Sequence, residues 1–383
     1  MLPIPPTGNA SAREPQLIRV LQAAAQGRND LRLTTFSESE ILWALETGLG
    51  PVLLETTKAD PEATTSPLWP LLHGTNMTAR VITAEHLDAM AEIIDACATR
   101  VPPLILLKGI SVCGQYYPEP HLRPMRDIDF LIGADHFPAV ESSLFKLGYR
   151  QKSNAPAGFY EKHHHSMPFF HPQRAIWVEV HRGLVPPRSR LSRDRVFSLE
   201  NLKSQIQPSE FQGRTVSRLS DELQIVYIAS HWAQQFRAVG GMIAMLDMIY
   251  LWNNKRPKLD WDKLFNWLSG SAASAYLYVL LSYLDKYRLI DISPEILSRL
   301  SSQQRSFGSV NLKIVRSLID RCLVEGRHYG KALRLRNRAL IWEALLSGRS
   351  PLINLLLVPW KLALPHRLKK RFQPLRDRFC IGT

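Results

Sequence analysis

The spacing of apolar residues along the chain changes at about residue 101. Between residues 16 and 100 apolar side chains recur every three or four positions, which is typical of amphipathic helices. One such face comprises Leu17, Ile18, Val20, Leu21 and Ala24, and a helical period also runs through residues 79–100. Pro102-Pro103 then interrupts the pattern. The first hundred residues are therefore expected to be mainly helical.

Residues 101–185 alternate short apolar runs with helical stretches, the pattern of an α/β unit. The expected strands are 104–107, 127–132 and 176–180, and the expected helices are 110–117 and 137–147. Lys108-Gly109 is expected to turn the chain between the first strand and the first helix. Gly148 is a reasonable C-cap for the second helix.

The helical period returns at Ser220 and fills the next part of the chain. Asp221-Glu222 follow Ser220 and would lie in a first helical turn, where the helix dipole favours acids. His231 and Asp247 fall on expected helices and are expected to be structural hydrogen-bonding groups. Further helices are expected at 242–252 and 264–287.

The chain has 383 residues, which is too long for one ordinary core and fits two or three units. Its 45% apolar and 21% charged residues exclude disorder of the whole chain. The expected division is 1–100, a mainly helical region; 101–218, the core with the strands; 219–350, a helical domain; and 351–383, a basic tail.

The cysteines and the apolar runs bear on localisation. Four cysteines are scattered without a C-x-x-C pair, which argues against a zinc site of the usual spacing and fits a reducing compartment. The first residues do not resemble a secretory signal, and no run approaches the roughly 18 apolar residues of a membrane span. We expect a cytoplasmic protein.

Positive charge is concentrated at the C-terminal end. The net charge is +14, and residues 301–383 hold seventeen Lys/Arg against four Asp/Glu. Such asymmetry suggests an anionic partner for this region. We expect the apolar residues 352–364 to pack as a helix, and the basic residues 366–378 to contact RNA or an anionic membrane surface. The alternative is a packed helix with a solvated basic end.

Asp127 and Asp129 are the strongest chemical signal. In a strand, residues i and i+2 point to the same face, and two adjacent carboxylates repel unless a cation lies between them. Mg²⁺ suits such a pair when phosphate oxygens complete its shell. The alternative is two solvated acids at a strand end. Apolar flanks, Ile128 and residues 130–132, favour the cation site.

Phosphate-binding candidates lie near the two aspartates. Gly109, at the expected turn into a helix, would let backbone N–H groups approach phosphate, and Lys108 would add a positive charge. Arg123 and Arg126 precede the acids and could bind a triphosphate. Downstream, W-V-E-V-H places Glu179 on another expected strand.

These motifs together resemble a known family. L-L-K-G-I-S, then L-R-P-M-R-D-I-D-F-L-I, then W-V-E-V-H-R-G-L are similar to the uncharacterised nucleotidyltransferase family of bacteria, within the DNA polymerase β-like superfamily. The resemblance is strongest over residues 104–133 and 163–184 and continues weakly to about residue 265. It implies a nucleotidyltransferase-fold mixed sheet with flanking helices. With helical regions before and after it, the whole is expected to be an α+β fold.

The resemblance also implies roles for individual residues. Asp127, Asp129 and Glu179 would form the superfamily's carboxylate triad, which holds Mg²⁺ or Mn²⁺. Gly109 would belong to the glycine turn that meets the nucleotide phosphates. That turn is usually Gly-Ser or Gly-Gly, whereas here it is Lys-Gly-Ile-Ser, so Ser111 is a candidate replacement for the serine.

The histidines near the third motif allow two interpretations. His163-His164-His165 resembles a metal-binding run, but adjacent side chains point in different directions, so three in a row are not expected to bind one ion. In a strand His163 and His165 would share a face, and both active-site involvement of His165 and a polar surface strand remain open. His181 shares the face of Glu179, and it either supports the metal ligands through a hydrogen bond or simply packs in the core.

The predicted function is metal-dependent transfer of a nucleoside monophosphate from a nucleoside triphosphate, such as ATP, with release of pyrophosphate. The acceptor is open between a small molecule, a peptide or protein, and an RNA end. One alternative is a catalytically degenerate nucleotide-binding protein, which the presence of all three acids disfavours. Another is an anion-binding adaptor that acts through the basic tail.

Overall fold

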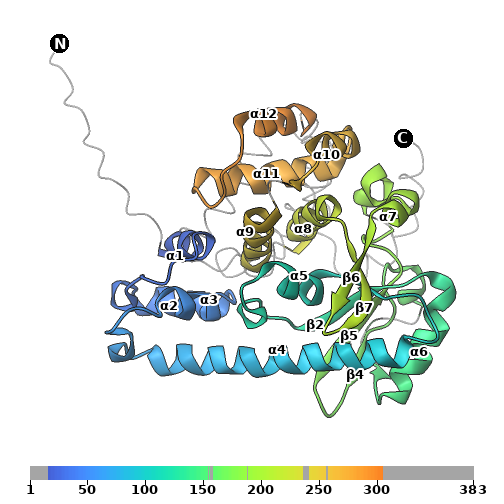
Figure 1. The fold of residues 1–383 in the computed structure, drawn as a ribbon, viewed down its shortest axis with the longest axis horizontal. Helices are drawn as coiled ribbons and strands as arrows, with labels where there is room; N and C mark the ends of the chain where they lie inside the picture. Colours follow the sequence, from blue (N-terminus) through green and yellow to red (C-terminus); the bar gives the residue numbers. More distant parts are fainter. Residues whose placement is uncertain are drawn as a thin grey trace, which may run out of the picture.

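The structure is a computed structural model that describes residues 16–153, 155, 158–187, 189–235, 241–255 and 258–304 (Figure 1). The expected basic tail, its apolar run 352–364 and the end of the expected helical domain lie outside the described residues. A seven-stranded sheet, with the order β3-β4-β5-β2-β1-β7-β6, lies at one end of a larger set of helices. The expectation of an α+β fold is confirmed.

The sheet is mixed, as expected. β2 runs parallel to β5, and β1 runs parallel to β7 but antiparallel to β2. The outer pairs β3–β4, β4–β5 and β6–β7 are antiparallel. The strands are β1 (Ile105–Leu106), β2 (Asp127–Leu131), β3 (Arg150–Gln151), β4 (Phe169–His171), β5 (Ile176–His181), β6 (Ile206–Phe211) and β7 (Arg214–Leu219).

Helices precede, interrupt and follow the strands. The helices before the first strand are α1 (Gln16–Ala25), α2 (Glu38–Glu46), α3 (Gly50–Thr56) and α4 (Trp69–Cys97). Those within the strand region are α5 (Lys108–Tyr116), α6 (Phe137–Lys146) and α7 (Leu199–Ser204). Those after it are α8 (Asp221–Gln235), α9 (Met242–Lys255), α10 (Trp261–Leu268), α11 (Ala272–Lys286) and α12 (Pro294–Gln303). In Figure 1, α4 runs along one side of the molecule, from the N-terminal helices to the sheet.

Alternation along β2 and β5 divides the core into two clusters. Ile128 and Phe130 of β2, with Val178 of β5, join a cluster that includes residues of α4 and α6. The intervening residues of the two strands point to the other face of the sheet. That face belongs to the side on which α1, α8, α9 and α11 form the larger cluster. The expected acids lie on this second face.

Several local expectations are confirmed and three are corrected. Ser220 caps α8 by accepting a hydrogen bond from the Leu223 N–H, and Gly148 follows α6 with φ +90°. The helix expected from residue 79 begins ten residues earlier, at Trp69. The single helix expected over 264–287 is two helices, because Gly270, with φ +69°, ends α10 before α11 begins.

The third correction concerns the expected turn at Lys108-Gly109. Both residues belong to the first turn of α5, and Lys108 rather than Gly109 has a positive φ, of +45°. The left-handed region is unfavourable for a residue with a long side chain, so this is a local strain. Tertiary contacts of Lys108 therefore hold a conformation that its sequence position did not predict.

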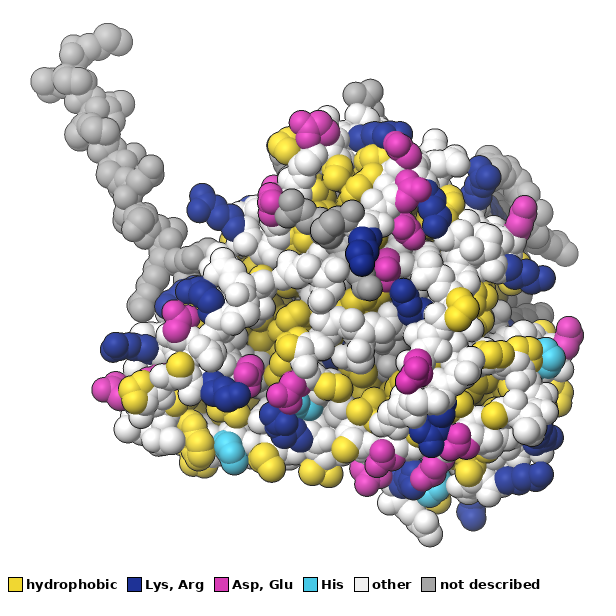
Figure 2. Space-filling view, in the orientation of Figure 1, with side chains coloured by type: hydrophobic (Ala, Val, Ile, Leu, Met, Phe, Trp, Pro, Cys, Tyr) yellow, Lys and Arg dark blue, Asp and Glu magenta, His cyan; other side chains and the backbone are white. Residues whose placement is uncertain are grey.

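The surface seen in Figure 2 carries acidic and basic side chains in alternation, without a large patch of one sign on that face. This agrees with the sequence, in which most of the excess positive charge follows residue 300. No helix of the described residues is both long and apolar enough to span a membrane.

Candidate active site

The register between β2 and β5 brings Asp129 and Glu179 together, two of the three predicted acids. Asp129 lies directly opposite Glu179 in the parallel pair, and His181 follows Glu179 on the same face. One ligand atom each from Asp129, Glu179 and His181 lies within 4.8 Å of the others. Asp127 precedes Asp129 by two residues and so faces the same side of β2. The three acids thus share one face of two adjacent strands.

Lys108 enters this group because of how β1 pairs with β2. The two strands are antiparallel, and the Leu107 N–H donates to the Asp129 backbone oxygen at 3.0 Å, so the next residue lies beside the acids. The Lys108 ammonium donates to Asp129 Oδ1 at 2.7 Å and lies 3.8 Å from Glu179 Oε2. The sequence predicted a phosphate contact for Lys108. In the structure its ammonium lies against the carboxylates.

His181 completes the surroundings of Asp129. Its side chain is buried, and its Nε2 lies 2.7 Å from Asp129 Oδ1 and 3.8 Å from Glu179 Oε2. A neutral imidazole with its proton on Nε2 would donate to the aspartate and hold its orientation. This contact is the one expected of a residue that supports the carboxylates.

Burial and mutual repulsion shift the pKa values of the acids apart. Burial and then the charge of Asp129 raise the pKa of Asp127 to about 6 and that of Glu179 to about 7. Burial alone would also raise the pKa of Asp129, but the Lys108 ammonium and the His181 hydrogen bond hold it well below its usual value. Burial lowers the pKa of Lys108, but the negative charges of Asp129 and the other acids outweigh this effect and raise the pKa above its ordinary value. The Lys108 ammonium thus lies against two of the three acids, Asp129 and Glu179.

Arg123, predicted to bind phosphate, is engaged elsewhere. Its Nε and Nη2 donate to the two carboxylate oxygens of Asp247, each at 2.9 Å, and the Tyr117 hydroxyl donates to the same carboxylate at 2.7 Å. This buried group joins the segment before β2 to α9, so Asp247 is a structural hydrogen-bonding group, as expected.

The position of Arg123 requires a glycine at residue 109. A Cβ at this position would lie 2.4 Å from Arg123 Nη1 and 2.9 Å from Met125 Cγ. Gly109 therefore permits a close side-chain approach in the first turn of α5. Within the part of the chain that the structure describes, no side chain caps this helix, so its first backbone N–H groups are not satisfied by a cap.

The other two phosphate candidates differ in exposure. Arg126 is exposed next to Asp127, and no hydrogen bond or ion pair of its side chain occurs among the described residues. Ser111 is buried, and its hydroxyl accepts a hydrogen bond from Gln115 Nε2 at 2.8 Å. Arg126 is thus free to meet a ligand in solution, whereas Ser111 is engaged within α5.

Two residues of α8 that the sequence did not indicate as site residues lie near the acids. Tyr227 and His231 are one helical turn apart, and the charges of Lys108 and Asp129 act on both. Tyr227 Oη and His231 Nε2 are buried without a hydrogen-bond partner among the described residues. Burial lowers the pKa of His231 to about 3, so its ring is neutral. In the sequence Tyr227 lies on the apolar face of a helix, which hides it. His231 was expected to be a structural hydrogen-bonding group, but its Nε2 forms no hydrogen bond with the described residues.

The histidine run does not form the expected strand. The chain bends at His163 and His164, and only His165 pairs, in an isolated antiparallel bridge with His181. The alternation expected for a strand is therefore wrong here, because a bend does not separate successive side chains onto opposite faces. All three rings converge, with one nitrogen of each within 4.8 Å of the others. His165 Nε2 lies 3.9 Å from Glu179 Oε2.

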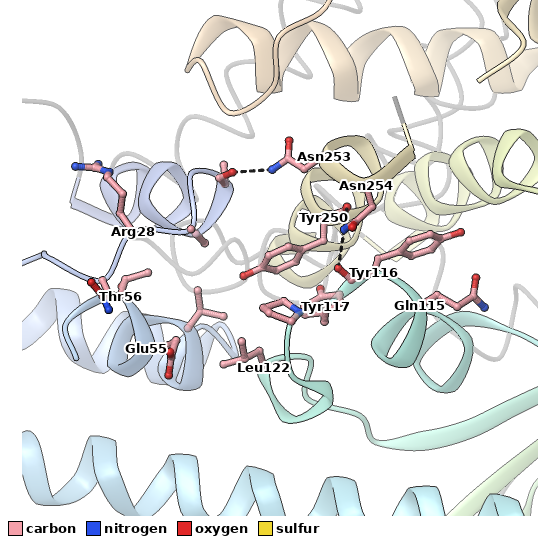
Figure 3. Close-up of a pocket in the computed structure, with 16 residues that line it drawn as sticks. Arg28, Glu55, Thr56, Gln115, Tyr116, Tyr117, Leu122, Tyr250, Asn253 and Asn254 are labelled. Atoms are coloured by element: carbon pink, nitrogen blue, oxygen red, sulfur yellow. Dashed lines mark hydrogen bonds between the residues drawn. The ribbon is translucent and has the colours of Figure 1, made fainter. Parts of the chain in front are cut away.

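A cavity of about 440 Å³ lies apart from the acids, between α1 and α3 on one side and α5 and α9 on the other (Figure 3). Tyr116, Tyr117 and Tyr250 contribute to its lining. Asn254, also in the lining, donates to the Tyr116 backbone oxygen at 2.9 Å. The cavity meets the C-terminal end of α5, roughly 12 Å along the helix from Lys108.

Comparison with known families decides the assignment. A model of the family described as "Uncharacterised nucleotidyltransferase" matches residues 40–288, well over half of the chain. The chain belongs to this uncharacterised nucleotidyltransferase family. The match extends the resemblance in both directions and includes β2, β5 and α8, the elements that carry the acids, Tyr227 and His231. Comparison with curated proteins and with solved structures gives no match.

Proposed function

We propose that the chain is a metal-dependent enzyme that transfers a nucleoside monophosphate from a nucleoside triphosphate to an acceptor hydroxyl. The observation that carries this proposal is the register of Asp129 with Glu179, with Asp127 on the same face beside an uncapped helix N-terminus. Membership of a nucleotidyltransferase family supports the reaction class.

The donor atoms suit a hard divalent cation such as Mg²⁺ or Mn²⁺. Asp127, Asp129 and Glu179 offer only carboxylate oxygens, which these cations prefer. Three ionised acids with one lysine carry a net charge of −2, which one divalent cation would neutralise. When bound, the cation would stabilise negative charge on the phosphate oxygens.

The chain's own residues would position the triphosphate. The first backbone N–H groups of α5 and the helix dipole favour an anion at this end of the helix. Arg126 is exposed beside Asp127 and can approach phosphate from solvent. The Lys108 ammonium already lies at the carboxylates, so a short movement of its side chain would bring it to phosphates bound there. Gly109 keeps the first turn of α5 close to Arg123, and Arg123 thereby positions this turn.

Glu179 is the residue best suited to accept the acceptor's proton. Burial and Asp129 raise its pKa to about 7, close to the value that favours a general base at neutral pH. As the proton moves to Glu179, the acceptor oxygen forms a bond to the α-phosphorus, the bond to the bridging oxygen breaks, and pyrophosphate leaves. His181 holds Asp129 in its orientation throughout.

The test is pyrophosphate release by the full chain with each of the four common ribonucleoside triphosphates. A cell extract supplies the acceptor, and labelled triphosphate identifies what becomes modified. We expect release that requires Mg²⁺ or Mn²⁺ and falls by about 10³-fold or more in Asp127→Asn, because loss of a ligand removes several kcal/mol of charge stabilisation. Asp95→Asn is the matched control, since Asp95 forms an exposed ion pair with Arg214 on the surface.

The degenerate binding protein is distinguished by the same assay. Binding of a triphosphate by calorimetry without any metal-dependent release would contradict the proposed transfer. Equal release by wild type and Asp127→Asn would show that the acids are not the site.

A further inference from the structure

The three consecutive histidines form a cluster whose geometry differs from that of the carboxylates. The ring centroids of His163 and His164 are 4.3 Å apart, those of His163 and His165 4.2 Å, and those of His164 and His165 4.8 Å. One nitrogen of each ring lies within 4.8 Å of the others. The bridge between His165 and His181 fixes one end of the run to β5.

The ring nitrogens that this packing buries lack protein partners. His163 Nδ1 and His164 Nδ1 have no hydrogen-bond partner among the residues that the structure describes. Buried polar atoms of native proteins usually have a partner, so the two unpaired nitrogens point to a missing one.

His165 is oriented as a metal-binding histidine usually is. Its Nδ1 lies 2.7 Å from the Ser166 backbone oxygen, and a proton on Nδ1 would donate to this carbonyl. The lone pair of the ring then lies on Nε2, the atom that points towards Glu179 at 3.9 Å. A hydrogen bond of this kind sets both the tautomer and the direction of a ligating imidazole.

The ligand class follows from the donors. Neutral imidazole nitrogens prefer Zn²⁺, Co²⁺ or Ni²⁺ over Mg²⁺. Three imidazoles bound at about 2.1 Å to one ion place their ring centroids roughly 5 Å apart, slightly more than the separations seen here. Three histidines with an open fourth position are a known zinc arrangement.

We propose that His163, His164 and His165 form a binding site for a zinc-like divalent cation, next to the Glu179 carboxylate and distinct from the pair Asp127 and Asp129. The bound ion would hold the bend at residues 163–165 against β5. It would thereby fix the aromatic pair Phe159 and Tyr160, whose rings pack against those of His163 and His165. This site does not depend on the proposed transfer reaction.

Cobalt titration of the tag-free, chelator-treated full chain tests the proposal. Excess Mg²⁺ is present throughout, so that oxygen ligands are occupied by a cation that nitrogen ligands do not prefer. We expect one Co²⁺ per chain with the visible absorption of a tetrahedral site, displaced by one equivalent of Zn²⁺. In His164→Gln the affinity should fall at least tenfold. His73→Gln, at an exposed position on α4, and Asp127→Asn should both retain the signal.

A second measurement covers the case in which His164→Gln does not fold, as judged by circular dichroism. X-ray absorption of the zinc-loaded wild type should then show at least two imidazole ligands. The absence of a tetrahedral cobalt spectrum, or a zinc shell of oxygen alone, would overturn the proposal. Cobalt affinity in folded His164→Gln equal to that of the wild type would also overturn it.

Discussion

Two buried groups of this molecule each place one basic side chain against carboxylates, and they differ in how the charges balance. Arg123 faces a single acid, Asp247, whose oxygens also accept from Tyr117. Lys108 faces Asp129 at 2.7 Å and Glu179 at 3.8 Å, and Asp127 lies on the same face. The first group is neutral and its hydrogen bonds are satisfied, whereas the second carries an excess of negative charge.

The difference separates structural from functional ion pairs. A buried pair with matched charge fixes two segments, and breaking it leaves an uncompensated charge. A cluster with excess charge destabilises the protein unless a further cation binds. Both arginine and lysine looked like phosphate-binding residues in the sequence, and only their partners distinguish them.

The largest expected effect is on the matched group. Arg123→Ala leaves the Asp247 carboxylate buried without its cation, so the free energy of unfolding should fall by about 3–5 kcal/mol. Urea denaturation measures the change. The double variant Arg123→Met with Asp247→Leu, which leaves no buried charge, should recover much of the loss. If Arg123→Ala is as stable as wild type, the matched pair does not stabilise the fold and the contrast with Lys108 fails.

Two tyrosines make a matched pair for the next effect. Tyr117→Phe removes a hydrogen bond to a buried charge and should cost roughly 1.5–3 kcal/mol of stability. Tyr227→Phe removes a hydroxyl without a partner among the described residues and should cost less than about 0.5 kcal/mol. If Tyr227 meets the nucleotide, its variant should instead raise KM. Equal losses of stability would show that both hydroxyls serve the fold.

Lys108→Met should strengthen metal binding. Without the ammonium, the acids retain their full repulsion, so Mg²⁺ should bind at least tenfold more tightly, equal to about 1.4 kcal/mol. Triphosphate affinity, measured in the same titrations with Mg²⁺ present, should fall if the lysine reaches phosphate. The control is Lys263→Met, whose ammonium pairs with Glu222 on α8. Unchanged Mg²⁺ affinity in Lys108→Met would place the metal elsewhere.

The last expected effect is a dependence of stability on pH. The folded pKa of Glu179, about 7, exceeds its ordinary value, so between pH 4.5 and 7 the folded state binds a proton that the unfolded state has lost. In metal-free protein this group's contribution to stability therefore decreases as the pH rises through that window. Glu179→Gln should remove the contribution. Thermal unfolding of the variant and of wild type is measured across this pH window, and the difference between their stabilities isolates the contribution of Glu179. A difference that does not change with pH would contradict the raised pKa.

The sequence predicted those features that depend on local spacing. Alternating acids and apolar residues in D-I-D-F-L-I were enough to place Asp127 and Asp129 on one face of a strand. Ser220 and Gly148 worked as helix signals because capping is a local interaction. The third acid, Glu179, is indicated by the resemblance to the family, and the family match extends that resemblance.

Features that depend on distant partners were not predictable. The partner of Arg123 lies 124 residues away, and nothing near either residue indicates the contact. The position of Lys108 follows from the antiparallel pairing of β1 with β2. The spacing of residues along the sequence does not show whether two strands pair in parallel or antiparallel. The convergence of the three histidines depends on a bend where the sequence pattern favoured a strand. The basic tail, 351–383, lies outside the described residues, and its anionic partner stays a prediction.

Helix α4 is a long element of fixed length. Its 29 residues make a rod of roughly 43 Å. Leu72, near its start, packs in the larger core cluster, and Ile93, near its end, packs beneath the sheet. Because both ends of α4 pack in core clusters, its length should stay the same whatever ligand binds. Spectroscopic labels on its exposed side chains, such as Val81, would therefore be fixed reference points for following movement of the segment around residue 160.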